Sequence, residues 1–147
     1  MGGYPAPGGM PGMAPGVGMG GATAGGITIN MQIQLRSVRT GQLLHTRRGL
    51  KYRHPGSSGQ DEVSTTAMPS AETVWTVLPP WDRMRNPKGM QQEPARPVNE
   101  HQEFRLLNQS SLTALHSHNL HSPTTKQQEV TGFDAADDND NWKITKV

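Results

Sequence analysis

The sequence has no cysteine and few aromatic residues, and each deficit narrows what the protein can be. Without thiols the chain cannot form disulfide bridges, cysteine-ligated zinc sites, iron–sulfur clusters or a cysteine nucleophile. No apolar run approaches the roughly 20 residues that a membrane-spanning helix needs. Hydrophobic residues make up 32% of the chain and aromatic residues 5%, which is below the usual share for globular proteins. We therefore expect a modest core and no transmembrane segment.

The charge is nearly balanced, with a formal net charge of +2, which is far from the dense positive field of a typical nucleic-acid-binding protein. One stretch, residues 36–53, is basic and contains no acid. It could bind phosphate, RNA or anionic lipid, or it could be a solvated hairpin whose charged edges deter pairing with other strands. We favour the hairpin, so nucleic acid is not an expected partner. The basic residues are Arg36, Arg39, Arg47, Arg48, Lys51 and Arg53.

Residues 1–26 contain most of the glycines and no charged residue. A Gly/Pro/Met-rich segment of this kind cannot bury enough side chain to offset its ordering entropy, so we predict a flexible, disordered tail. The tail also lacks the basic start and apolar stretch of a secretory signal. A full-length chain of this sequence is therefore expected in the cytoplasm.

The rest of the chain, residues 27–147, has the pattern of an all-β domain. Apolar and polar residues alternate strictly from Ile27 to Leu35, which predicts a half-buried strand. No later segment has helical periodicity, and Pro and Gly divide it into short pieces. Short strands separated by turns are typical of all-β folds.

Two halves of this region share residues at fixed offsets. An offset of 71 residues pairs Leu35, Leu44 and His45 with Leu106, Leu115 and His116. An offset of 67 residues pairs Gln60, Glu62, Val63 and Trp75 with Gln127, Glu129, Val130 and Trp142. The change of offset falls in a Gly/Ser-rich loop, where insertions are tolerated. We predict a repeat one at 27–79, a connector at 80–99 and a repeat two at 100–147, with a shared core of Leu44, Val63, Trp75, Leu115, Val130 and Trp142.

The second copy contains LHSHN at 115–119, QQEVTGF at 127–133 and DDNDNWKI at 137–144, and this combination resembles the MIR motif. MIR motifs occur in protein O-mannosyltransferases, stromal-cell-derived-factor-2-like proteins, and inositol-trisphosphate and ryanodine receptors. The resemblance implies a β-trefoil, which has three four-stranded repeats. Two are recognisable here, so a third is either missing or supplied by a partner, and self-association or binding of a partner protein is expected.

The resemblance also implies a non-catalytic module that binds a glycan or a glycosylated or client protein. An alternative is the accessory module of a protein O-mannosyltransferase, and another is a structural, self-assembling protein. A fragment of the resembled families would lie in the endoplasmic reticulum lumen or at its membrane. Glycan binding in isolation, flanking transmembrane sequence and ligand-free assembly would distinguish these three hypotheses.

Two clusters in the second half of the chain contain residue types that bind metals. His116, His118 and His121 have a spacing that would place the first two on one face of a strand. Four aspartates between 134 and 140 offer oxygen ligands but lack EF-hand spacing, and a solvated turn explains them better. We therefore predict no metal and no cofactor.

No catalytic constellation emerges either, because Ser117 is only a sequence neighbour of the histidines. Trp81, in the connector, either stacks on a ligand or caps the junction between the repeats. The polar groups of the second repeat gather near one predicted hairpin and suit a shallow, hydroxyl-rich ligand. The candidate ligand-binding residues are His116, His118, Asn119, Gln127 and Gln128.

Overall fold

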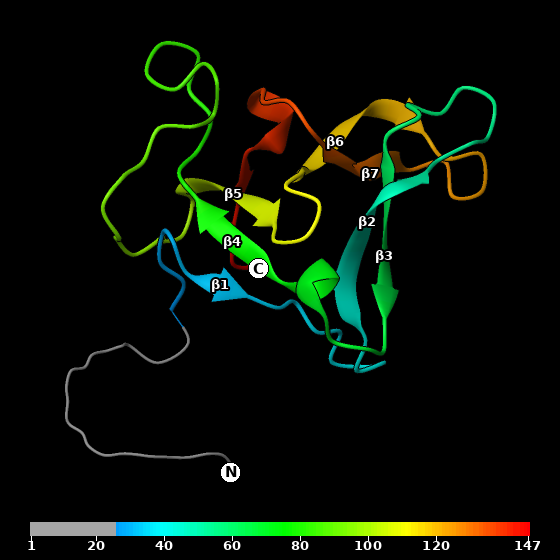
Figure 1. Cartoon of the computed structure of the whole chain (residues 1–147), viewed down its shortest axis with the longest axis horizontal. Helices are drawn as coiled ribbons and strands as arrows, with labels where there is room; N and C mark the ends of the chain where they lie inside the picture. The colour runs from blue at the N-terminus through cyan, green and yellow to red at the C-terminus, as the bar shows by residue number, and fades with distance from the viewer. Residues whose placement is uncertain (1–25) are drawn as a thin grey trace.

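The computed structural model describes residues 26–147, and these form an all-β structure with two single-turn 3-10 helices (Figure 1). The predicted tail at 1–26 lies outside the described residues except for Gly26. The all-β prediction is confirmed. In chain order the strands are β1 (Gln32–Ile33), β2 (Leu43–Lys51), β3 (Asp61–Thr66), β4 (Trp75–Leu78), β5 (Glu103–Asn108), β6 (Ala114–His121), β7 (Gln128–Phe133) and β8 (Trp142–Lys143).

The strands form one curled antiparallel sheet that resembles half of a barrel. Its order is β1-β4-β5-β6-β7-β3-β2, with β8 paired to the remaining part of β5. β5 therefore has β4 along one edge and shares its other edge between β6 and β8. Within the described residues, β5 is thus the one strand that pairs with three others.

Two long hairpins, β2–β3 and β6–β7, stand side by side and are joined through β3 and β7. The joining register pairs Asp61 with Gly132 and Glu62 with Thr131. Each hairpin has an irregular register toward its tip, beyond Thr46 in β2 and beyond Ser117 in β6. The two hairpins place residues from both halves of the sequence against each other.

The strand predicted from the alternation between Ile27 and Leu35 is wrong in extent, because only β1 is strand there. Asn30 adopts a left-handed conformation with φ of 77°, and Met31 N donates to Thr28 O at 3.1 Å. This turn interrupts the strand while Ile29 still reaches the core and is fully buried. The alternation therefore matched buried or partly buried side chains from Ile27 to Ile33, but it marked neither a continuous strand nor the exposed Leu35.

The core lies inside the curl of the sheet. Trp75 and Ile29 are fully buried, and Trp142, at the end of the chain, is partly buried against the same cluster. The buried members are Ile29, Trp75, Val77, Phe104, Leu106 and Leu115, and the partly buried ones are Ile27, Ile33, Leu44, Val63, Val98, Val130 and Trp142.

The segment between β4 and β5 folds back onto the sheet. Ile29 N donates to Arg96 O and Val98 N donates to Ile27 O, each at 2.9 Å. Trp81 is tied down, because its indole N–H donates to Pro87 O and its backbone exchanges two hydrogen bonds with the Asn141 amide. Trp81 therefore joins the segment between β4 and β5 to the turn that precedes β8.

Among residues 26–147 there is no helix of the length and apolar character needed to cross a membrane.

Candidate functional site

The β6–β7 hairpin carries the five candidate residues, but it separates them into an inner and an outer group. His116 is 2% exposed and points inward, and His118 is half-buried beside it, with ring centroids 5.0 Å apart. Asn119, Gln127 and Gln128 are exposed toward the tip of the hairpin. The outer group is available to a ligand, whereas His116 supports the hairpin from within.

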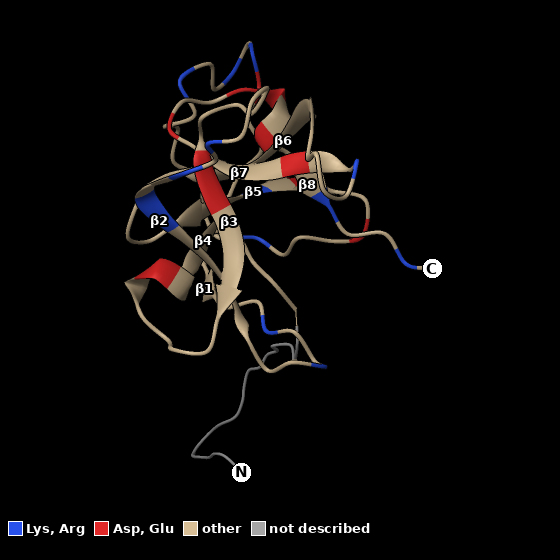
Figure 2. Ribbon diagram, turned by 90° about the vertical axis from the view of Figure 1, so that its right-hand side faces the viewer, with Lys and Arg blue, Asp and Glu red and all other residues tan. Residues whose placement is uncertain are grey.

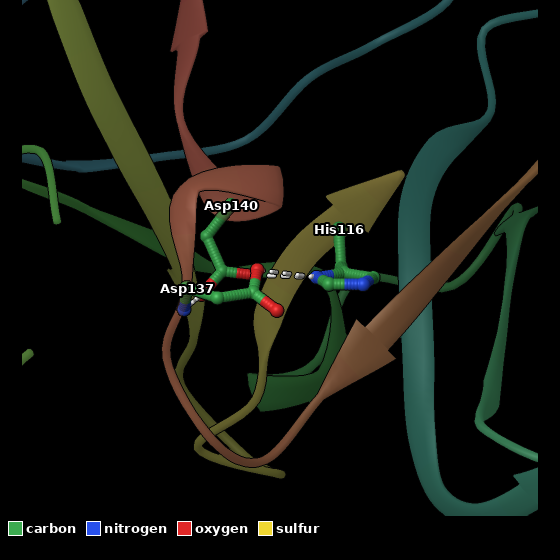
Figure 3. A group of neighbouring side chains, drawn as sticks. All are labelled: His116, Asp137 and Asp140. Carbon is green, nitrogen blue, oxygen red and sulfur yellow. Dashed lines mark hydrogen bonds and ion pairs between the residues drawn. The ribbon is translucent and has the colours of Figure 1, made fainter. Parts of the chain in front are cut away.

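His116 is held by the turn that precedes β8, in the 3-10 helix η3 (Asp138–Asp140). Its Nδ1 donates to Asp140 Oδ1 at 2.7 Å, and Asp137 approaches the same nitrogen at 3.6 Å (Figure 3). Its ring also packs against Phe133, with centroids 4.3 Å apart. Asp140 is fully buried, so the interpretation of the acidic run as a solvated turn is wrong for this residue. Burial is tolerated because the carboxylate is fully hydrogen-bonded.

The donor atoms of His116, Asp137 and Asp140 all lie within 4.8 Å of one another, which is a spacing that a metal ion could use. Each of the two carboxylates already has a structural role. Asp140 Oδ2 accepts from Asp137 N and the Asp137 side chain accepts from the Asp140 backbone, which makes a capping box; Asp137 Oδ1 also accepts from Asn139 N. The 3-10 helix η2 (Ala71–Thr73), just before Trp75, forms the same box. It does so with the hydroxyls of Ser70 and Thr73, so this turn forms without carboxylates.

His118 contacts a second buried carboxylate, that of Glu129 on β7. The Glu129 side chain is 1% exposed, and its Oε1 accepts from His118 Nε2 at 3.2 Å and from Ser58 N at 3.3 Å. His54, from the loop after β2, approaches Oε2 at 3.4 Å. One carboxylate thus joins the β6–β7 hairpin to the loop of the neighbouring β2–β3 hairpin.

Glu129 stays ionised in this setting. Burial by itself would raise its pKa, but hydrogen bonds from Ser58 and His118 and the charge of His118 outweigh burial, so the pKa of Glu129 lies below its usual value. At neutral pH the ionised carboxylate therefore accepts hydrogen bonds from both Ser58 and His118.

The outer group forms a small amide surface on the hairpin. Gln128 Nε2 donates to Asn119 Oδ1 at 3.2 Å, across the irregular part of the β6–β7 ladder. Gln127 lies in the adjacent turn, where its backbone N–H donates to Thr125 Oγ1. The free donors and acceptors of these amides face solvent, which is the arrangement that a polyhydroxylated ligand requires.

Most basic side chains of the 36–53 stretch bond to other groups of the protein. Arg47 pairs with Glu72 at 3.0 Å, Lys51 pairs with Asp61 at 3.0 Å, and Arg48 donates to Ser111 O. Figure 2 shows the basic part of β2 beside acidic segments of β3 and of the turn before β4. The Arg47 guanidinium also holds the pKa of Glu72 below its usual value. This pairing fits the hairpin interpretation of the stretch.

Sequence reasoning missed the supporting residues of this site. The repeat offset only matches Glu129 with Glu62, and nothing in the sequence links Glu129 to His54, which is more than 70 residues away. The Gln60–Glu62 segment gave the nearest signal, because it repeats the Gln127–Glu129 segment and pairs with β7.

No protein-family model and no curated protein matches the sequence. Two solved structures are similar in fold. A Caenorhabditis elegans protein of unknown function has a TM-score of 0.70 and 23% identity, covering 86% of this chain and 68% of its own. An SDF2-like protein from Arabidopsis thaliana has a TM-score of 0.63 and 20% identity, covering 80% of this chain and 59% of its own.

The chain shares its fold with an SDF2-like protein. This agrees with the family to which the 115–144 motifs pointed. The chain spans less than two thirds of that SDF2-like protein's length, so the likeness concerns the fold of the matched part alone.

Proposed function

We propose that the protein is a non-catalytic recognition module, made of two MIR-type repeats of a β-trefoil, that binds a glycan or a glycosylated or client protein. Two kinds of observation support this proposal. One is the internal agreement between the two halves of the chain, and the other is the polar surface of the β6–β7 hairpin.

The two matched tryptophans support the repeat. Trp75 Nε1 donates to Leu44 O at 3.1 Å, and Trp142 Nε1 donates to Leu115 O at 2.9 Å. The four residues are those that the two offsets pair with one another. Each tryptophan also follows a single-turn helix with the same capping box. The same local arrangement, a capped single-turn helix followed by a tryptophan that donates to a leucine carbonyl, therefore occurs in both halves of the chain.

The exposed amides of Asn119 and Gln128 carry the recognition proposal. They lie on a strand pair that is fixed from behind by two buried carboxylates, Glu129 and Asp140. A rigid backing lowers the entropy lost when a ligand orders the surface side chains. Weak, shallow binding of hydroxyl groups fits such a surface better than an enclosed small-molecule site.

The test is binding of the full chain to an array of mannose-containing glycans and glycopeptides. Asn119→Ala and Gln128→Ala should each weaken binding while the melting temperature stays close to that of the wild type, because both side chains are exposed. Gln109→Ala is the matched control, since Gln109 belongs to another exposed amide pair, with Gln32, away from the hairpin.

Loss of binding in the Gln109 variant as well would contradict a site at the hairpin. Failure of the folded wild-type protein to bind any mannose-containing glycan or glycopeptide would remove the carbohydrate proposal and leave recognition of a protein surface.

A further inference from the structure

A cavity of about 500 Å³ lies between the β4–β5 segment and the outward face of β5, away from the β6–β7 tip. In β5, Phe104 and Leu106 enter the core, so Arg105 and Leu107 point to the opposite face, where the cavity lies. Its volume is in the range of small-molecule sites. The walls are mainly apolar and include Leu78, Leu107, Leu112, Ala114 and Phe133.

Arg105 gives this cavity a buried cation. The residue is 4% exposed, and its guanidinium donates from Nε to Pro79 O at 2.7 Å and from Nη2 to Gly89 O at 2.9 Å. Within residues 26–147 it forms no ion pair with a carboxylate, and Nη1 has no hydrogen-bond partner. Burial lowers the pKa of Arg105, and the charge of Asp140 acts in the opposite direction. An oxyanion placed at Nη1 would interact strongly with this cation, because little water screens charges at a buried group.

The backbone at Gly89 passes close to Arg105 Nη1. Gly89 has a φ of +69°, and a Cβ built there would lie 2.7 Å from Arg105 Nη1 and 2.8 Å from Ala136 Cβ. Only glycine lets the chain pass this close to the guanidinium. Lys88 adds a second cation to the lining, and Asp134 is the one acidic residue of the wall within the described chain.

We propose that this cavity binds a small molecule with an apolar body and one oxyanion group, a carboxylate or a phosphate ester, with the anion on Arg105 Nη1. The apolar body packs against Leu107 and Phe133. The site is separate from the hairpin surface of the proposed function, so either can fail without the other.

The experiment is an NMR titration of the full chain with benzoate, its neutral analogue benzamide, and phenyl phosphate. The amides of Gly89 and Ala136 should shift saturably with benzoate, and benzamide should bind at least about tenfold more weakly, because it lacks the charge-assisted bond. A preference for phenyl phosphate over benzoate, or the reverse, identifies which oxyanion the site takes.

Three variants locate the site. Arg105→Met should reduce the affinity for benzoate to that for benzamide. Because Arg105 also holds the backbone of Pro79 and Gly89, a second variant leaves it intact: Ala135→Trp places a bulky side chain in the lining and should weaken both ligands. Ala67→Trp, on an exposed loop outside the cavity, is the matched control and should bind as the wild type does.

Equal affinities for benzoate and benzamide, no saturable shift in folded wild-type protein, or unchanged binding by Ala135→Trp would each overturn the proposal. Glycan binding at the β6–β7 hairpin should be the same in Ala135→Trp as in the wild type, which keeps the two sites distinguishable.

Discussion

Glu129 is a buried carboxylate on which two histidines from different hairpins converge. His118 lies on the β6–β7 hairpin, as Glu129 does, and His54 lies on the β2–β3 hairpin. Ser58 donates its backbone N–H to the Glu129 carboxylate. A buried charge is stabilising only while these partners are in place. The residue therefore couples the β6–β7 hairpin to the loop of the β2–β3 hairpin, which is distant in sequence.

Acid should weaken the fold through Glu129. Its pKa is lower in the folded protein than in the unfolded chain, so its contribution is present above the unfolded value of about 4.3 and is lost as pH falls through the folded value. Urea unfolding from about pH 7 to about pH 3 should show this loss in the wild type. Glu129→Gln should have a shallower pH dependence. Glu103→Gln, at an exposed carboxylate, is the control and should follow the wild type; a Glu129 variant with the wild-type slope would contradict this role.

The core residues that the sequence offsets predict can be compared with their burial in the structure. Trp75 is fully buried and Leu115 is 7% exposed, and Leu44, Val63, Val130 and Trp142 pack partly buried against the same cluster. The matching offsets predict these positions, because a repeated unit would need equivalent apolar side chains in equivalent places. The offsets carried no information about His54 or Arg105, whose partners come from unrelated parts of the chain.

At the scale of strands, β7 depends on a close approach at Gly132. A Cβ at this position would lie 2.7 Å from Thr113 Oγ1 and 3.2 Å from Thr46 Oγ1. Gly132 pairs with Leu115 of β6 and with Asp61 of β3, so it lies where the two hairpins join. A side chain there would separate the hairpins.

Gly132→Ala should therefore destabilise the protein by about 1–3 kcal/mol, as overpacking in a well-packed interior usually does. Urea denaturation measures this as a lower midpoint with an unchanged slope. Combining it with Thr113→Ala, which removes the closest atom, should cost less than the sum of the two single changes. Strict additivity would show that the clash at Thr113 is not the cause.

The β4–β5 segment is the element that the sequence described least well. Its proline content and polarity predicted a connector between repeats, whereas the structure makes it a wall of the cavity and binds it to β5 through Arg105. Composition reports that a segment lacks regular structure, but it does not report what the segment packs against.

At the scale of the whole molecule, β1, β2 and β8 each pair with a single strand within the described residues, and β1 and β8 are the short ones. Within the described residues, β1 pairs only with β4, and β8 pairs only with β5. Exposed apolar side chains follow each strand, Leu35 after β1 and Ile144 after β8, at 43% and 48% exposure. Unpaired edges with apolar neighbours favour pairing with another chain.

Sedimentation velocity of the 16.0 kDa chain should therefore show a mass that rises with concentration. Leu35→Lys and Ile144→Lys should shift the equilibrium toward the monomer, because a charged edge disfavours strand addition. Met68→Lys is the control, since Met68 is 73% exposed but lies in the loop after β3. A wild-type protein that sediments as a monomer at every concentration would contradict association through these edges.

The sequence by itself determined the all-β class, because period-two alternation and closely spaced turn residues are local signals. Only the tertiary structure decided that the Ile27–Leu35 alternation is broken at Asn30, that Asp140 is buried on His116, that Glu129 faces His54, and that Arg105 lines a cavity. Those outcomes depend on which distant segments meet when the sheet curls, and a single sequence does not encode that pairing in any local pattern.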